Sequence, residues 1–330
     1  MVSNSIKGCF QVCDQKLRSL VDSVPGVLKH ARAENTNKKY ECYFKQWISW
    51  CNQFREIKPL PTQEQYIVLF VIAGIQQGKS FSVIESTIMA IKYFHSISGF
   101  QLTQTPLLKH ALEAAKRLLG RNPKKKEPVT VDMLKLMIKT LSMGKNSLKA
   151  LRLITILIVS FTGFLRFSEC QNLRRSDLKF FTTHAMIFIE KSKTDVYRSG
   201  HWLCLARLKS GFCPVQTLEL YCKRINEGSN SHNFIFRALT SKQTLRKSNK
   251  TISYSTILKE FKAIIDVLGF DKELYGLHSL RSGGVSSAAN FGVKDRLLMK
   301  HGRWKSQNVK NRYISESMNS LLLVSRNLGL

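Results

Sequence analysis

The chain is poor in acidic residues relative to basic ones. Its 330 residues include 22 Asp and Glu against 52 Lys and Arg, which gives a formal net charge of +30 at pH 7. A small soluble domain usually carries a net charge of only about 2–8. Because so many like charges repel one another in a compact chain, the sequence predicts a polyanionic partner. A nucleic-acid backbone is the usual one, and an anionic membrane the less usual one.

The eight cysteines lack the spacings of a metal site or a redox site. None forms a C-x-x-C pair, and Cys213 and Cys222 have no histidines at the spacing of a zinc finger. Most of the cysteines lie inside apolar runs, as buried thiols do. We therefore expect a reducing compartment, no disulfide framework and no zinc.

No apolar run is long enough to form a signal peptide or a membrane span. The first residues, MVSNSIKGCFQVC, contain no extended apolar block. The most apolar stretch, residues 151–165, is interrupted by Arg152, Thr155 and Ser160, and it is shorter than the ~20 residues that a membrane span needs. This stretch predicts a buried core helix.

Hydrophobic periodicity divides the chain into two domains. Residues 1–30 are weakly patterned and predict a flexible leader. Apolar residues recur at helical spacing in four stretches of residues 31–120, which predicts a compact helical domain. The segment GRNPKKKEPVT then breaks all periodicity, so we expect a basic linker over residues 121–129. The second domain, residues 130–330, begins with Thr130 as a plausible N-cap.

Local signals place several helix starts and one hairpin. Thr62 and Ser82 each precede a Gln or Glu by three residues, as in a capping box, and Pro106 predicts the start of a fourth helix. In the second domain, residues 185–190 and 201–206 read as two strands that flank a polar loop. Helical patterns fill most of the remainder. The expected fold class is therefore mainly α with a small antiparallel β-sheet.

Cationic side chains and one tyrosine stand out in the second domain. His278 and Arg281 are three residues apart and share one face of a helix start. Arginine grips two phosphate oxygens at once, and a set of cations can neutralise the charge of a pentacoordinate phosphorus. A tyrosine can then be the nucleophile, although its phenol has a pKa near ~10 and needs help to lose its proton. The candidate residues are Arg166, Lys193, His278, Arg281, His301, Trp304 and Tyr313.

These residues lie in motifs that follow a fixed order: TGFLRFSEC, KSKTD, HSLRSGG, KHGRW and RYI. The ordered set resembles the tyrosine recombinase (phage integrase) family, and in particular its eukaryotic, transposon-borne members of the Crypton type. Residues 31–120 look like the helical, SAM-like core-binding domain of that family, and residues 130–330 look like its catalytic domain. The resemblance implies DNA integration and recombination through a 3′-phosphotyrosyl link, without ATP, metal or other cofactor.

The resemblance also implies a role for each matched residue. Arg166 and Arg281 fall on the two arginines that clamp the phosphate. Lys193 falls on the hairpin lysine that acts as general acid to the leaving 5′-oxygen. Lys191, two residues away, is an alternative, and Lys193 is preferred because it lies in the K-T pair that resembles the family motif. The other matches are His278, which handles a proton; His301, on a position that is His in many members; Trp304, which matches the tryptophan that other members use; and Tyr313, the nucleophile.

The implied partner is double-stranded DNA, bound by a protein that forms a homotetramer when it recombines two duplexes. No membrane partner is expected. High basicity without an export signal predicts a nuclear protein if the host is eukaryotic. Candidate phosphate contacts beside the first helical stretch and in the linker are Lys38, Lys39, Lys45, Lys124, Lys125 and Lys126.

Other interpretations stay open at this point. The chain could be a domesticated, catalytically inactive DNA-binding protein of the same fold, or a type IB topoisomerase. Arg166 could cap the dipole of the preceding helix with Glu169 as its ion-pair partner. Trp304 and Tyr313 could be packing residues.

Overall fold

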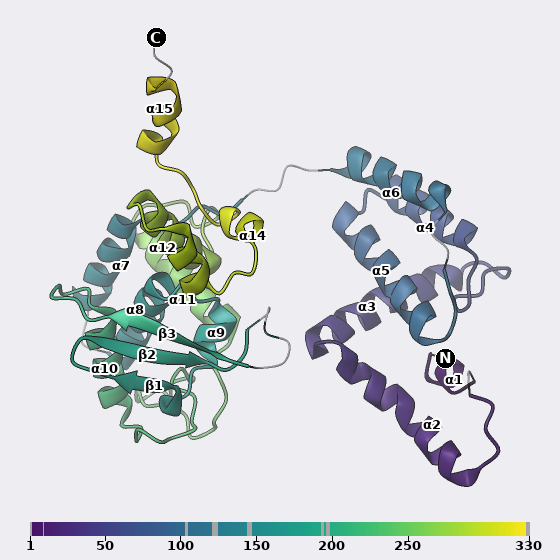
Figure 1. Ribbon diagram of the computed structural model, residues 1–330, viewed down its shortest axis with the longest axis horizontal. Coiled ribbons are helices and arrows are strands. Elements are labelled where there is room, and N and C mark those ends of the chain that lie inside the picture. The colour runs from purple at the N-terminus through teal and green to yellow at the C-terminus, as the bar shows by residue number, and fades with distance from the viewer. Residues whose placement is uncertain are drawn as a thin grey trace. The chain divides into compact units, whose positions relative to one another are not determined.

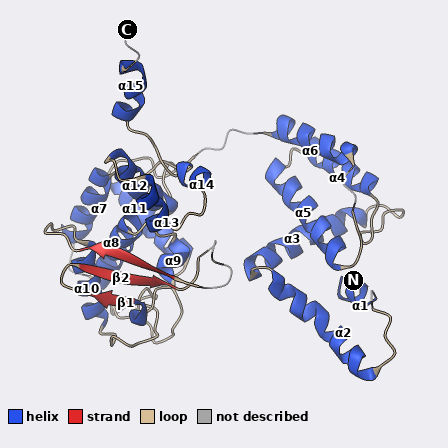
Figure 2. Ribbon diagram, viewed as in Figure 1, coloured by secondary structure: helices blue, strands red, loops and turns tan. Residues whose placement is uncertain are grey.

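In the computed structural model, the chain divides into two compact units, residues 1–123 and 124–330. Most of the described residues are helical, and a small sheet lies in the second unit (Figure 1). Figure 2 shows the same elements by type, and the predicted fold class is confirmed. The structure describes residues 2–8, 10–102, 105–120, 125–143, 147–192, 195 and 199–327.

Four helices enclose the core of the first unit, with α3 packed along α5 and α4 along α6. Trp47 and Trp50 stack with their ring centroids 5.4 Å apart, and both meet the edge of Phe70. Such aromatic pairs add to the free energy that burial of the rings already provides. The predicted aromatic stripe is therefore a core face. The helices are α3 (Glu34–Cys51), α4 (Glu64–Gln76), α5 (Phe81–Ile97) and α6 (Pro106–Leu119).

Two of the predicted helix starts are wrong. The N-cap of α4 is Gln63 and that of α5 is Ser80, and neither side chain bonds its helix. The backbone N–H of Thr62 donates instead to Nε2 of His95 at 2.9 Å, so Thr62 belongs to a loop tied to α5. The predicted start of α6 at Pro106 is confirmed.

The segment that the sequence predicts as a flexible leader contains two helices, α1 (Val2–Gly8) and α2 (Gln15–Leu28). The side chain of Asp14 caps α2 by accepting from two backbone N–H groups. A short 3₁₀ turn, η1 (Lys29–Ala31), follows. Pro25 lies inside α2, and none of the residues of this helix is buried.

The second unit packs its helices around α8 (Leu148–Thr162) and against a three-stranded antiparallel sheet of order β1-β2-β3. The sheet register pairs Leu178 with Ile187 and Ile187 with Leu203. The strands are β1 (Leu178–Phe180), β2 (His184–Ile189) and β3 (His201–Ala206), preceded by the 3₁₀ turn η2 (Arg175–Asp177). The other helices are α7 (Val131–Met143), α9 (Phe167–Gln171), α10 (Pro214–Ile225), α11 (Tyr254–Val267), α12 (His278–Asn290), α13 (Asp295–Gly302), α14 (Gln307–Asn311) and α15 (Met318–Arg326).

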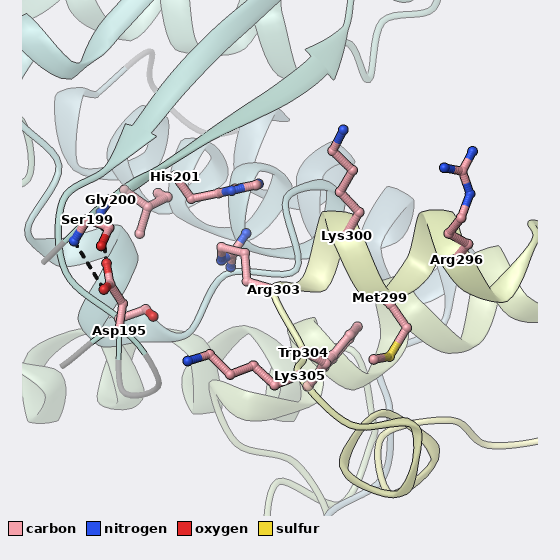
Figure 3. A pocket seen from close by; sticks show the side chains of 12 residues that line it. Asp195, Ser199, Gly200, His201, Arg296, Met299, Lys300, Arg303, Trp304 and Lys305 are labelled. Carbon is pink, nitrogen blue, oxygen red and sulfur yellow. Dashed lines mark hydrogen bonds between the residues drawn. The ribbon is translucent and has the colours of Figure 1, made fainter. Parts of the chain in front are cut away.

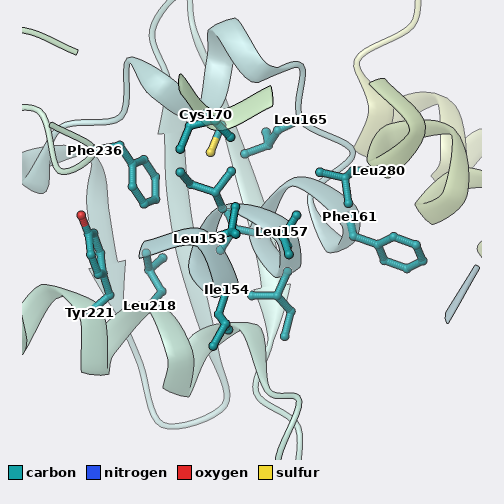
Figure 4. Close-up of a cluster of buried hydrophobic side chains, with 14 of the residues drawn as sticks. Leu153, Ile154, Leu157, Phe161, Leu165, Cys170, Leu218, Tyr221, Phe236 and Leu280 are labelled. Atoms are coloured by element: carbon teal, nitrogen blue, oxygen red, sulfur yellow. The ribbon is translucent and has the colours of Figure 1, made fainter. Parts of the chain in front are cut away.

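The most apolar stretch of the sequence is the central helix of this unit, α8, as predicted. Leu153 and Leu157 on α8 pack with Tyr221, Phe236 and other buried side chains (Figure 4). Its one arginine, Arg152, is buried as well and donates to Glu260 at 3.0 Å. Across the described residues, no helix has both the length and the apolar character that crossing a membrane requires.

Two glycines allow α12 to approach its neighbours with backbone against backbone. A Cβ on Gly283 would lie 2.0 Å from the carbonyl oxygen of Val129, and one on Gly284 would lie 2.0 Å from that of Phe161. These contacts set α12 against the end of α8 and the chain before α7. Since α12 begins with His278 and carries Arg281, the glycines fix where both residues lie.

Gly284→Ala is therefore expected to lower the free energy of unfolding of the second unit by about 3 kcal/mol, at the upper end of the usual cost of overpacking. Hydrogen exchange of the α8 amides measures this unit separately from the first. Gly211→Ala is the matched control, because a Cβ there meets nothing within 4 Å. Equal exchange in the two variants would contradict the close packing of α12.

Candidate active site

The chain between α8 and α9 turns sharply and presents Arg166. Phe164 has a left-handed backbone with φ of 48°, and Arg166 follows as the N-cap of α9. Glu169, in the first turn of α9, accepts from the backbone N–H of Arg166 at 2.9 Å and from its Nη1 at 2.6 Å. The ion pair considered from the sequence is confirmed. The carboxylate holds the arginine side chain at the helix start.

Arg281 reaches the same carboxylate from α12. Its side chain is completely buried and donates to the backbone oxygens of Phe164 and Gly302. Its Nη1 lies 3.8 Å from Oε2 of Glu169. Arg166 and Arg281, separated by more than a hundred positions in the sequence, therefore converge on one carboxylate.

A third arginine, Arg303, joins this cluster, and sequence reasoning missed it. Arg303 ends α13 in a left-handed conformation and donates to Glu169 at 2.8 Å and to the backbone oxygen of Phe164 at 3.1 Å. A signal was available, since Arg303 lies between the matched residues His301 and Trp304. Its partners are distant in the sequence, and no local pattern predicts the contact.

Charge in this cluster is unbalanced. Burial alone would raise the pKa of Glu169, but the charges of Arg303, Arg166 and Arg281 and the backbone N–H of Arg166 lower it overall. Burial, and after it the neighbouring Arg166, lowers the pKa of Arg281. Three guanidinium groups around one carboxylate leave an excess of positive charge, which favours binding of an anion.

Aromatic rings cover the guanidinium group of Arg281. The ring of Trp304 lies 4.5 Å from it and that of Tyr313 5.2 Å, within the range of cation–π attraction. The centroids of the Trp304 and Tyr313 rings are 5.3 Å apart. The ring of His278 lies 5.1 Å from that of Tyr313. The predicted nucleophile is thus surrounded by three of the residues that the sequence grouped with it.

Several buried N–H groups in this cluster lack an acceptor. Within the described part of the chain, no hydrogen-bond partner is found for Nε1 of Trp304 or for Nε of Arg281 and Arg303. A buried donor without a partner costs free energy, so native proteins rarely leave several together. Elsewhere in the described residues, the Nε atoms of Arg152, Arg175, Arg207 and Arg237 lack a partner as well, so this feature does not by itself single out the cluster.

The histidine beside Tyr313 is a neutral base at neutral pH. Burial lowers the pKa of His278, and the charges of Arg281 and Arg166 lower it further. The ordinary pKa of a histidine, about 6.5, already lies below 7, so a lowered pKa favours the uncharged imidazole at neutral pH. An uncharged imidazole can accept a proton.

His301 forms its hydrogen bond outside the arginine cluster. Its Nε2 donates to the backbone oxygen of Thr162 at 2.8 Å, and its ring meets Phe164 with the centroids 4.7 Å apart. Burial lowers the pKa of His301, while the Thr162 carbonyl raises it. The ring therefore fastens the end of α13 to the end of α8. Of the two candidates in KHGRW, Trp304 is the one beside Arg281 and Tyr313.

A cavity of about 560 Å³ lies beside the cluster, between the start of β3 and α13 (Figure 3). Arg303 and Trp304 form part of its wall, and His201 and Lys305 line it too. On the hairpin side, Asp195 accepts from the backbone N–H groups of Ser199 and Gly200 at 3.1 and 2.8 Å. Among the described residues, four cationic ones line the cavity, Arg296, Lys300, Arg303 and Lys305, against the one carboxylate of Asp195, so the cavity is rich in positive charge.

Only one of the two hairpin lysines lies in the described part of the chain. Strand β2 ends at Ile189, so Lys191 lies beyond the strand, where it is exposed. Lys193 lies outside the described residues. The preference for Lys193 rests on the K-T pair that resembles the family motif, and it stays a prediction.

The basic residues considered for DNA binding differ in their surroundings. Lys38 pairs with Glu34 at 2.6 Å, and Lys39 lies 5.5 Å from the ring centroid of Tyr43. Lys45 and Lys125 are exposed, Lys126 donates to the backbone oxygen of Glu273, and Lys124 lies outside the described residues.

The described residues also show no group of three His, Cys, Asp or Glu side chains that could hold a metal ion. The cysteines among them, Cys13, Cys42, Cys51, Cys170, Cys204, Cys213 and Cys222, are free thiols.

Comparison with known proteins identifies the family of the chain. Residues 127–320 match the phage integrase family, and the chain belongs to that family. A curated relative, an integrase/recombinase xerD homolog of Selenomonas ruminantium, is 27% identical over 294 residues, which are 88% of this chain and 84% of the relative.

Solved structures show the same fold at low sequence identity. The XerH site-specific recombinase bound to palindromic difH substrate gives a TM-score of 0.63 at 12% identity, over 100% of this chain and 95% of that chain. A lambda integrase dimer bound to a COC′ core site gives 0.58 at 17% identity, over 91% of this chain and 77% of that chain.

Proposed function

We propose that this protein is a site-specific DNA recombinase that breaks and rejoins DNA through a 3′-phosphotyrosyl intermediate. The observation that carries the proposal is that Arg166 and Arg281 meet at Glu169, while Tyr313 lies beside Arg281, His278 and Trp304. Membership of the phage integrase family supports it. So do the recombinase and integrase names of the relatives.

In this proposal the arginine cluster binds the phosphodiester. Arg166 and Arg281 donate to its non-bridging oxygens, and Nε1 of Trp304 supplies a further donor. The role that the sequence left between His301 and Trp304 is thus assigned to Trp304, while His301 fixes the loop that carries it. Donors placed in advance where charge builds up lower the barrier, because nothing has to reorganise during the reaction.

Tyr313 then attacks the phosphorus. A bond forms between its phenolic oxygen and phosphorus, and the bond from phosphorus to the 5′-oxygen breaks. Neutral His278 takes the phenolic proton, and the leaving 5′-oxygen receives a proton from Lys193, in the role that the family resemblance implies. A partner strand's 5′-hydroxyl later reverses these steps, so the energy of the broken bond is conserved without ATP.

DNA is the proposed partner, and the protein's formal net charge of +30 supports this. Contacts from Lys38, Lys39, Lys45 and the lysines at 124–126 would displace counterions, so affinity should fall steeply with salt. We further propose a homotetramer on DNA, because recombination of two duplexes requires four cleavages. A nuclear location in a eukaryotic host and a closer kinship to Crypton-type members belong to the same proposal.

The test is covalent attachment to DNA. Duplexes bound by the full chain are selected from a randomised pool, nicked beside each candidate phosphate, and incubated with the protein. A denaturing gel then reports any protein–DNA adduct. We expect an adduct with the natural chain and none with Tyr313→Phe. Tyr275→Phe is the matched control and should still form the adduct, because Tyr275 is a buried tyrosine outside the cluster.

The outcomes separate the proposed function from its alternatives. Binding of selected duplexes without any adduct would favour a domesticated DNA-binding protein. An adduct accompanied by relaxation of supercoiled DNA without site preference would favour a topoisomerase. An adduct that survives Tyr313→Phe would show that another residue is the nucleophile.

A further inference from the structure

Lys310 is a buried lysine that the proposed chemistry does not use. Its side chain is 2% exposed, and its Nζ donates to the carboxylate of Asp295. Lys310 lies in the last turn of α14, and the backbone N–H of Tyr313 donates to its carbonyl oxygen at 2.9 Å. Asp295 is in the first turn of α13. The ion pair therefore fastens the helix before the nucleophile to the helix that ends at Arg303.

The chain after Tyr313 is fastened as well, to α12. The hydroxyl of Ser286 donates to the backbone oxygen of Tyr313 at 3.2 Å and accepts from the N–H of Ser315 at 2.8 Å. The side chain of Asn290 donates to the oxygen of Ser315 at 3.1 Å. Since α12 also carries His278 and Arg281, the bonds to Ser286 and Asn290 set Tyr313 against the phosphate-binding residues of its own subunit.

We propose that Lys310 and Asp295 are positioning residues that hold Tyr313 in line for attack. This inference rests on the proposed function. Asp295 and Lys310 restrain the backbone before the tyrosine, and Ser286 and Asn290 restrain it afterwards. A displacement of about 1 Å at a reacting group can cost about 10²-fold in rate. A restraint three residues from the nucleophile therefore acts on the chemical step.

A contribution to the free energy of unfolding does not explain the Lys310–Asp295 ion pair well. A buried ion pair is weak support for stability, because both charges lose hydration, and an apolar replacement is often neutral. The burial here is also unequal: Asp295 is 57% exposed, whereas Lys310 is 2% exposed. Removing the lysine leaves a carboxylate that water can solvate, whereas neutralising the aspartate leaves a buried ammonium group.

The unequal burial of Lys310 and Asp295 determines which variants are informative. Lys310→Met keeps the buried volume and removes the restraint, so the chain should fold with a urea midpoint close to that of the natural protein. Asp295→Asn should lower the midpoint more. Lys262→Met is the matched control, because Lys262 also pairs with a carboxylate in the second unit, that of Glu273 at 2.8 Å.

The decisive measurement is the single-turnover rate of adduct formation at saturating selected duplex, together with the dissociation constant for that duplex. We expect Lys310→Met to slow adduct formation by about 10–100-fold with an unchanged dissociation constant. Lys310→Arg should recover part of the rate, and Lys262→Met should react at the natural rate. If Lys310→Met formed the adduct as fast as the natural protein, the inference would be overturned.

Hydrogen exchange supplies a readout that needs no DNA. In Lys310→Met the amides of residues 311–315 should exchange faster, while those of α8 keep their protection. Faster exchange throughout the second unit would show a merely structural role and would also overturn the inference. If the natural chain forms no adduct on any duplex, the proposed function fails. The exchange pattern still decides whether Lys310 restrains the Tyr313 segment.

Discussion

Replacing Arg281 by lysine is expected to slow covalent attachment to DNA by at least about 10³-fold. A single donor to a developing oxyanion is typically worth about 10²–10³ in rate, and an arginine on a transferring phosphoryl group can be worth more. Arg281 uses two nitrogens to bridge the backbone oxygens of Phe164 and Gly302. Lysine carries its three N–H donors on one nitrogen, which cannot occupy both positions of the guanidinium fork and also face the phosphate.

The control for this prediction is a second buried arginine. Arg237 is 5% exposed and pairs with Glu227 instead of Glu169. Arg237→Lys should cost the second unit comparable stability and leave the rate of attachment within a few-fold of the natural protein. Both variants should bind the selected duplex in a gel-shift assay. A folded Arg281→Lys protein that attaches to DNA within tenfold of the natural rate would remove Arg281 from the proposed chemistry.

The largest effect on stability is expected from Glu169→Gln. The carboxylate is 1% exposed and contacts Arg166, Arg281 and Arg303. Removing one partner of a buried ion pair typically costs about 3–5 kcal/mol, because the remaining charge stays buried without compensation. Glu219→Gln is the matched control. That carboxylate pairs with Arg207 near the surface, where such a pair contributes about 0–1 kcal/mol.

The same carboxylate predicts a pH dependence. Although burial opposes it, the neighbouring arginines lower the pKa of folded Glu169 below its ordinary value. A lowered folded pKa contributes stability at pH values above the unfolded pKa, and this contribution is lost as the pH falls through the folded value. The natural protein should therefore lose stability in acid faster than Glu169→Gln does. Parallel urea midpoints from pH 6 to pH 3 would contradict this account.

Sequence reasoning located the residues whose spacing is local. The pair His278 and Arg281 shares one helix turn, and Arg166 follows directly on a helix that the apolar pattern identifies. The central helix and the hairpin strands were predictable because apolar periodicity reports burial. Strand β1 was not, since three residues are too short to show alternation.

Contacts between distant elements could not be predicted in the same way. Arg303 meets Glu169 because α13 ends in a left-handed residue, and that geometry joins positions 134 apart in the sequence. Lys310 was overlooked because a lysine in a polar helix is normally solvated. Its burial depends on how α14 packs against α13. Thr62 was misassigned because its backbone bonds His95, a partner 33 positions away.

The end of the linker has a consequence for how strongly the two units would hold one DNA duplex. The N–H of Glu127 donates to the oxygen of Leu274 at 2.8 Å, and that of Val129 to the oxygen of Ser279 at 3.0 Å, so the chain is anchored just before the helix of Arg281. Between Leu119 and Glu127 the backbone can span at most about 28 Å, whatever its conformation. A tether this short confines an unbound unit near its bound neighbour at an effective concentration of about millimolar. Two DNA contacts that are weak separately, one from each unit, would therefore combine into a high affinity for the duplex. Cutting the connection between the units would lower this affinity far more than removing any single lysine.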